Sequence, residues 1–258
     1  MVKKKSTRKH DKQKAVHLER HNGKKGGILE EKYLEDFVYG GIDGSVTTFA
    51  VVAGATGASL TPGIVIILGF ANLVADGFSM AISNYLGKKS EKERVKKLRR
   101  QEEKEVDVIP HIERQEIMDI FSKKGFEGEL LEKVTDVITA DRKVWIDTMM
   151  KDELNVCEYE QRNPKKAGLY TFIAFILIGF IPLLSYVISY FTDIINSHVF
   201  IVSIILTVIA LSVVGAVRGH IVEKSRAFMA FETVMIGGAA AALAYLVGYL
   251  LRSLATVA

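Results

Sequence analysis

Five stretches of this chain are apolar over a length that matches the thickness of a lipid bilayer. They lie near residues 37–59, 63–86, 167–190, 198–217 and 229–251. A helix needs about 20 apolar residues to cross the hydrocarbon core, where every backbone polar group must be bonded within the chain. The sequence therefore predicts an all-α membrane protein with five transmembrane helices.

The charged residues lie almost wholly outside these stretches. Lys, Arg, Asp and Glu make up 25% of the chain and are concentrated in residues 1–35 and 88–166. This partition is typical of a membrane protein with a water-facing insert. We expect a basic tail at 1–35, two membrane helices at 36–87, a helical insert at 88–166 and three membrane helices at 167–258.

The distribution of Lys and Arg predicts the orientation in the membrane. The tail, the insert and the connection at 218–226 are rich in these residues, whereas the connections at 59–62 and 191–197 contain none. Positive residues favour the cytosolic side. We therefore expect the N-terminus and the insert in the cytosol, and the C-terminus outside or in a lumen. No extended sorting tail is evident, which favours the cytoplasmic membrane of a prokaryote over a vacuolar membrane.

Proline and glycine positions predict where the helices end and where they pack. Residues 63–109 contain no proline, so the second span should continue beyond the membrane as one helix that stops at Pro110. Two further helices fit 111–124 and 127–156, the second with a break near residue 140. Pro182 should kink the third span. Gly40 and Gly44, one turn apart, predict close packing of the first span.

Two carboxylates interrupt the first two apolar stretches. They are Asp43 and Asp76, and no Lys or Arg lies in either stretch to pair with them. Charge within a membrane span is rare because it is costly, and it usually faces a partner helix or a polar path. The plainer interpretation is that both aspartates hydrogen-bond between helices. We favour a path for a divalent metal cation.

A polar series continues along the second span at intervals of one helical turn: Asn72, Asp76, Met80 and Asn84. Carboxylate oxygens suit Fe²⁺, Mn²⁺ or Ca²⁺, whereas a methionine sulfur favours the softer transition metals. Glu232, by contrast, begins the fifth stretch, where the helix dipole stabilises a carboxylate, so we assign it a structural role.

The insert contains a second group of potential ligands. Its members are Glu102, Glu105, Glu113, Glu116, Met149, Met150 and Glu153. Pairs of glutamates on a charged helix are usually a solvated surface. Thioethers beside carboxylates in so polar a segment also fit an iron site, and the spacing alone leaves both interpretations open.

Several segments together resemble the vacuolar iron transporter family. They are Gly40–Gly44 with Thr47, Gly69–Met80, Tyr85–Glu91, Trp145–Leu154 and Ile181–Leu183. The resemblance covers the chain from about residue 30 to its end, and the order of spans and insert agrees with it.

The resemblance implies a homodimeric five-span transporter that moves Fe²⁺, and often Mn²⁺, out of the cytosol in exchange for protons. It implies an ion path at the dimer interface, lined by the first two spans and including Asp43 and Met80. It also assigns metal binding to all seven residues of the insert group. No prosthetic group is implied, since the metal ion is the cargo.

One departure from the family pattern concerns this path. Well-known eukaryotic members have a glutamate where this chain has Asn72, and a small residue where it has Asp76. The carboxylate is thus moved one turn, about 5 Å, along the helix. The charge of the path is kept, while metal preference and proton coupling are left open.

Three other functions fit parts of the sequence. A membrane-anchored ferroxidase would use the insert glutamates, but there is no Glu-x-x-His or His-Glu-x-x-His motif, and we do not expect an enzyme. A metal sensor would use the spans only as an anchor, and a calcium or manganese exporter would differ only in cargo. Basic residues flank the spans instead of clustering with aromatics, so we expect the lipid bilayer and not nucleic acid as a partner.

Overall fold

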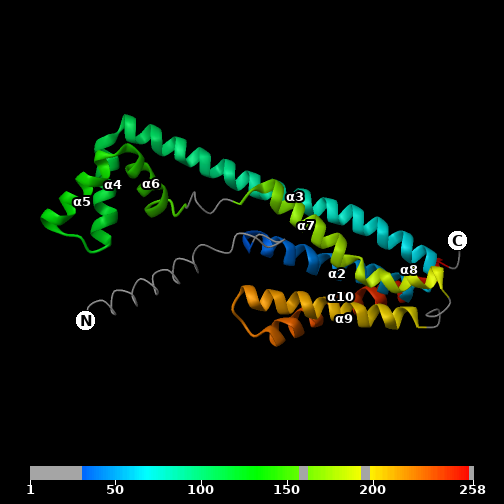
Figure 1. Ribbon diagram of the computed structural model, residues 1–258. Helices are drawn as coiled ribbons and strands as arrows, with labels where there is room; N and C mark the ends of the chain where they lie inside the picture. Colours follow the sequence, from blue (N-terminus) through cyan, green and yellow to red (C-terminus); the bar gives the residue numbers. More distant parts are fainter. Residues whose placement is uncertain (1–30, 157–161, 193–197, 256–258) are drawn as a thin grey trace, which may run out of the picture. The chain divides into compact units, whose positions relative to one another are not determined.

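The computed structural model describes residues 31–156, 162–192 and 198–255, and every regular element within these ranges is a helix (Figure 1). The elements are η1 (Glu31–Tyr33), α2 (Leu34–Gly57), α3 (Pro62–Val108), α4 (Pro110–Lys123), α5 (Gly128–Ala140), α6 (Arg142–Asp152), α7 (Pro164–Gly179), η3 (Ile181–Leu183), α8 (Leu184–Phe191), α9 (Val199–Ile221) and α10 (Arg226–Ala255). The basic tail expected at 1–35 lies almost entirely outside the described residues.

Five helical segments of the described chain are long and apolar enough to cross a membrane. They are α2, α3, the α7–η3–α8 segment, α9 and α10. The prediction of an all-α membrane protein with five spanning helices is confirmed at this level.

The chain divides into two compact units. The membrane unit comprises residues 1–84 and 165–258, and the insert unit comprises residues 85–164. Helix α3 contributes its first part to the membrane unit and its last part to the insert unit.

The helix ends of the insert unit follow from local chemistry. Helix α3 runs without interruption to Val108, and Pro110 occupies the first turn of α4, where its missing N–H is not needed. After α4 the chain turns at Gly125 with φ of 93°, a conformation that glycine adopts readily. Asp141 Oδ1 accepts hydrogen bonds from Lys143 N (2.8 Å) and Val144 N (3.2 Å), which starts α6 after the expected break.

Pro182 interrupts the third span as predicted. Helix α7 ends at Gly179, a single 3₁₀ turn contains Pro182, and α8 continues the segment. The hydroxyl of Ser203 on α9 donates to the carbonyl oxygen of Pro182 (2.7 Å), so that α9 is bonded to the interruption.

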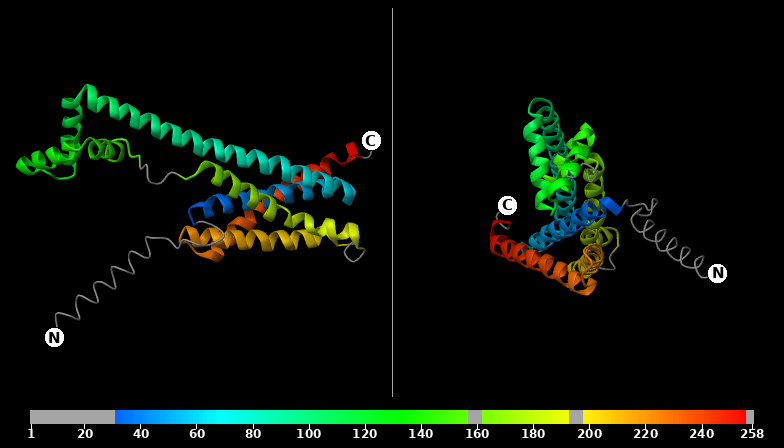
Figure 2. Two further views of the ribbon diagram at one scale, coloured as in Figure 1. Left: turned by 45° about the horizontal axis from the view of Figure 1, so that its top comes forward. Right: turned by 90° about the vertical axis from the view of Figure 1, so that its left-hand side faces the viewer.

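Helix α2 lies between α7 and α10 in the membrane unit, and glycines allow the close approach on both sides (Figure 2). On one side, a Cβ on Gly44 would lie 2.5 Å from the carbonyl oxygen of Phe175 in α7, and Gly40 is equally crowded by Thr171. On the other side, Gly57 contacts the backbone of α10. The predicted packing role of Gly40 and Gly44 is therefore confirmed.

Replacement of Gly44 by alanine should destabilise the membrane unit, because the new methyl group would collide with the Phe175 carbonyl of α7. We expect a loss of about 1–3 kcal/mol in the free energy of unfolding, typical of overpacking. Thermal denaturation of the detergent-solubilised protein would measure it. Gly238→Ala is the control, because a Cβ there meets nothing within 4 Å. Equal melting temperatures for the two variants would contradict the proposed contact.

Candidate metal-binding sites

The five glutamates of the insert group come together from three helices. Glu102 and Glu105 lie near the end of α3, Glu113 and Glu116 lie on α4, and Glu153 caps the C-terminus of α6. The carboxylates of these residues are close enough to repel one another, since each raised pKa in the group has several of the others among its causes. The chain reversal at Pro110 is what brings the α3 pair toward the α4 pair.

Two of these glutamates are almost fully enclosed. Glu102 is 4% exposed and Glu113 is 3% exposed, and each has a buried Oε2 atom with no hydrogen-bond partner in the described part of the chain. Burial raises the pKa of Glu102 to about 7, and the other four glutamates of the group add to this, Glu153 most strongly. Burial likewise raises the pKa of Glu113 to about 7.

The remaining glutamates are more accessible. Partial desolvation raises the pKa of Glu153, and the charges of Glu116 and Glu105 raise it further. Glu105 accepts a hydrogen bond from Gln101 Nε2 (3.1 Å). Within residues 85–156, no Lys, Arg or His forms an ion pair with any of the five. A cluster of negative charge without a counter-charge is a site that attracts a cation.

The two methionines of the group are core residues. Met149 is 0% exposed and Met150 is 2% exposed, and both belong to the apolar core of the insert unit together with Ile117, Trp145 and Ile146. The backbone N–H of Glu153 donates to the carbonyl oxygen of Met149 (3.0 Å). Packing thus accounts for both side chains, and their role as thioether ligands stays a prediction.

The carboxylates gather without forming a finished coordination sphere. Among the described residues, no three His, Cys, Asp or Glu side chains converge as ligands around one point. Like charges without a cation repel, and glutamate side chains have several rotatable bonds. Binding of an ion would therefore require the carboxylates to rotate inward, with release of the protons that burial favours.

In the membrane unit, Asp43 and Asp76 lie at the same level of the two helices. Asp43 is fourteen residues before Gly57, where α2 ends, and Asp76 is fourteen residues after Pro62, where α3 begins. Because a short connection joins these antiparallel helices, both carboxylates are about 21 Å from the turn. They are close enough to interact electrostatically.

Neither of these carboxylates has a protein partner in the described chain. The hydrogen bond at Asp43 involves only its backbone oxygen, which accepts from Thr47 Oγ1 (2.8 Å), and none is made by the side chain of Asp76. Asp43 is half-buried and Asp76 is exposed on the surface of α3. The interpretation that both merely hydrogen-bond between helices finds no such bond in the described residues.

A different aspartate does play that structural role. Asn84 Nδ2 on α3 donates to Asp36 Oδ1 on α2 (2.9 Å) and to Thr171 Oγ1 on α7 (2.8 Å), so it ties three helices together. Sequence reasoning placed Asn84 at the end of the polar series of α3. The structure shows it bonded inside the membrane unit.

The other members of the series, Asn72, Asp76 and Met80, differ in how far they are buried, so they do not share one face of α3. Met80 packs against the apolar core of the membrane unit, and Asn72 is half-buried with its Nδ2 atom enclosed and without a partner in the described residues. In the part of α3 that belongs to the membrane unit, residues 62–84, the exposed polar positions are Asp76, Ser79 and Ser83. A polar series taken at every fourth residue does not predict this strip, because its residues follow one another at steps of three and four.

The prediction that Glu232 begins its helix is wrong, because α10 begins at Arg226 and has no acidic residue in its first turn. Glu232 forms an ion pair instead. Its Oε2 atom lies 3.1 Å from Arg218 Nη1, which pairs α10 with α9. The residues around Glu232 in the sequence do not indicate that Arg218, on another helix, is its partner.

One known protein family matches most of this chain. Residues 34–249 match the model of the VIT family. The chain belongs to the VIT family. Among curated VIT-family proteins, vacuolar iron transporters of two parasites are similar: that of Toxoplasma gondii is 32% identical over 85% of this chain and 74% of its own length, and that of Plasmodium berghei is 30% identical over 94% and 92%. Vacuolar iron transporter 1 of Arabidopsis thaliana is 32% identical over 82% of this chain and 83% of its own length. This VIT-family chain is therefore a membrane protein whose relatives are named as transporters.

The raised pKa values predict how the stability of the insert unit depends on pH. A glutamate whose pKa rises from 4.5 to about 7 on folding stabilises the fold below pH 4.5, and this contribution is lost as pH rises through 7. Glu102→Gln cannot ionise, so the variant should lose less stability than the parent between about pH 5 and pH 8. Melting temperatures in metal-free buffer would measure this difference.

Glu127→Gln serves as the control, because Glu127 is exposed and belongs to no cluster. Its melting temperature should follow the parent at both pH values. The same pH dependence in Glu102→Gln and in the parent would show that Glu102 is already ionised and solvated in the folded protein.

Proposed function

We propose that this VIT-family protein exports Fe²⁺ from the cytosol in exchange for protons, that it also accepts Mn²⁺, and that it acts as a homodimer. The main support for the proposal comes from Asp43 and Asp76. These two carboxylates lie on candidate spanning helices, interact electrostatically and have no cationic partner in the described chain. Two such charges are costly in hydrocarbon, and a passing divalent cation would compensate both.

The chemistry of the residues near this level favours a transition metal. Carboxylate oxygens alone suit Ca²⁺, Mg²⁺ and Mn²⁺ equally well, whereas the thioether of Met80, one turn from Asp76, favours a softer ion. The relatives named above are vacuolar iron transporters, which supports Fe²⁺ as the cargo.

The insert unit would capture the ion before transport. Its glutamates lack counter-cations, and the pKa of Glu102 and of Glu113 is about 7. Both are therefore partly protonated at cytosolic pH, and a metal ion must displace those protons in order to bind. Competition of this kind between metal and proton for the same oxygens is the simplest basis for exchange.

A cytosolic position of the insert follows from the Lys and Arg distribution. The relatives are named for the vacuole, and the same direction of transport applies in a vacuolar or a cytoplasmic membrane. In both membranes, transport in the proposed direction removes iron from the cytosol.

The surface of α3 supports the proposed dimer. Asp76, Ser79 and Ser83 form an exposed polar strip next to exposed apolar residues, among them Val74 (60%) and Phe78 (61%). A polar strip facing lipid would be unfavourable. A second copy of the chain on this face would enclose the strip and place two sets of carboxylates beside one path.

Removal of the path ligands should abolish transport. In proteoliposomes loaded with an Fe²⁺-sensitive dye, Asp43→Asn and Met80→Ala should each reduce the flux by about tenfold or more, since even indirect partners of a metal contribute about 10–100-fold in affinity. Met235→Ala is the matched control, because Met235 is an exposed methionine on spanning helix α10. Parent-like flux in both path variants would refute this path.

Proton exchange predicts a dependence of the flux on the pH gradient. Acidification of the compartment that receives Fe²⁺ should accelerate uptake in the parent, and Asp76→Asn should weaken this response because it removes an exchangeable carboxylate. The same vesicles, tested with Fe²⁺, Mn²⁺, Co²⁺ and Ca²⁺, would give the metal preference. If the Fe²⁺ flux did not depend on the pH gradient, proton exchange would be excluded, but iron transport would not.

A further inference from the structure

We propose that Arg99 and Arg142 are positioning residues for the glutamate cluster of the insert unit. They fix α6 on α3 through acids outside the cluster, and so leave the five glutamates without a competing cation. The inference rests on the proposed metal binding by this cluster.

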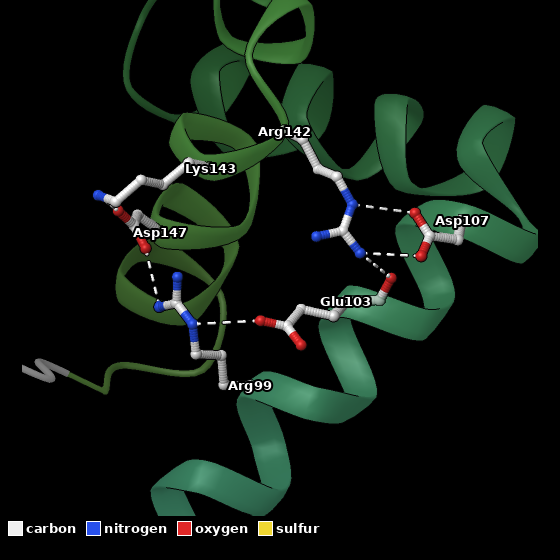
Figure 3. A network of polar contacts seen from close by, with 6 residues as sticks. All are labelled: Arg99, Glu103, Asp107, Arg142, Lys143 and Asp147. Atoms are coloured by element: carbon white, nitrogen blue, oxygen red, sulfur yellow. Dashed lines mark hydrogen bonds and ion pairs between the residues drawn. The ribbon is translucent and has the colours of Figure 1, made fainter.

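Arg142 forms a fork with Asp107. It is the first residue of α6, and its Nε and Nη2 atoms donate to Asp107 Oδ1 (3.0 Å) and Oδ2 (2.8 Å) on α3 (Figure 3). Nη2 also donates to the backbone oxygen of Glu103 (3.1 Å). A bidentate pair of this type fixes direction as well as distance.

Arg99 forms a second connection between the same two helices. Its Nη1 atom donates to Asp147 Oδ1 on α6 (2.8 Å), and its Nε atom lies 3.4 Å from Glu103 Oε1 on α3. Lys143 Nζ donates to the other oxygen of Asp147 (2.7 Å). Figure 3 shows Asp147 held between Arg99 and Lys143, and Arg142 held at Asp107.

These connections are placed where they determine the position of Glu153. On α3, Arg99 and Asp107 lie on either side of Glu102 and Glu105 in sequence, and Glu153 directly follows the end of α6. Glu153 is the neighbour whose charge acts most strongly on Glu102. A shift of α6 along α3 by one turn would move Glu153 by about 5 Å, more than a metal–ligand bond allows.

The same connections also determine which carboxylates the two arginines bind. Arg99 is one turn from Glu102 on α3, yet it bonds to Asp147 and Glu103. An arginine bonded to Glu102 would compete with a metal ion for the carboxylate oxygens. The outer acids therefore keep the guanidinium groups away from the cluster as well as joining the helices.

The Arg142–Asp107 pair is exposed, whereas the Arg99–Asp147 pair is partly buried, with 22% and 40% of the side chains exposed. Arg142 and Asp107 are 53% and 58% exposed in their side chains, and such ion pairs contribute little to stability in water. The effect of such a pair on metal affinity is limited to a few-fold, because without the pair α6 can return to its place at the same small free-energy cost. A few-fold loss of affinity with a nearly unchanged melting temperature is therefore the expected result.

The test measures Mn²⁺ affinity and melting temperature on the full-length protein in detergent. Asp107→Asn, Asp147→Asn and Arg142→Gln should each weaken Mn²⁺ binding by about two- to fivefold, the range that one exposed ion pair allows. The fall in melting temperature should be small. The exchange of charges in Asp107→Arg with Arg142→Asp should restore part of the affinity.

Asp136→Asn is the matched control. Asp136 accepts a hydrogen bond from Arg114 (2.7 Å), so it also joins two helices of the insert unit, but these are α4 and α5 and not α6. Its Mn²⁺ affinity should equal that of the parent. An equal loss of affinity in this variant would show general loosening and overturn the positioning role.

A second comparison separates this inference from the proposed function. If Glu102→Gln lowers the Mn²⁺ affinity while Asp107→Asn and Arg142→Gln bind as the parent does, only the positioning role is overturned. If Glu102→Gln binds as the parent does, the positioning role fails together with the proposed capture of the ion by the insert unit, whereas the path at Asp43 and Asp76 is tested separately by the flux measurements.

Discussion

Repulsion between carboxylates that have no counter-cation is the constraint on which both candidate sites depend. In the membrane unit it acts between Asp43 and Asp76, and in the insert unit among five glutamates. Elsewhere the chain pairs its acids with arginine, as at Asp107 and Glu232. The insert unit contains many basic residues close in sequence to its glutamates, so the separation of charge there is a property of the fold and not of the composition.

Such a separation must be stabilised by interactions other than ion pairs. The insert unit has an apolar core that includes Ile117, Ile146 and Met149, all at most 1% exposed. Each fully buried side chain of this type contributes about 1.5–3 kcal/mol, whereas an exposed ion pair contributes about 0–1 kcal/mol. Packing therefore holds the carboxylates together against their repulsion, and the arginines determine how the helices are aligned.

The parts of the fold that depend on local sequence could be predicted. Apolar length gives the spans, the lack of proline gives the long α3, and Pro110 and Pro182 give the interruptions. The polar series on α3 does not lie on a single face of the helix, as its spacing had suggested. A step of four residues exceeds one helical turn and rotates by about 40°, so over three steps Asn84 reaches a different face from Asn72. Asn84 then bonds to Asp36, while Asp76 stays on the surface.

Partners that are distant in the sequence could not be predicted. Arg142 and Asp107 are 35 residues apart, and each lies in a segment with many residues of either charge. Only the arrangement of α6 on α3 selects one pair among them. The sequence thus indicates which residues are able to bind a metal, but not which residues keep those ligands free for it.

The exposed position of Asp76 bears on the proposed ion path through the membrane. Asn72 is half-buried and its amide nitrogen is enclosed, whereas Asp76 is exposed one turn farther along α3. A carboxylate at residue 72 would lie partly within one protomer, but at residue 76 it lies on the protomer's surface. A single chain leaves that charge facing lipid, which is unfavourable. A carboxylate at residue 76 therefore favours the proposed dimer more strongly than one at residue 72 would, because only a second chain on this face would shield it from lipid.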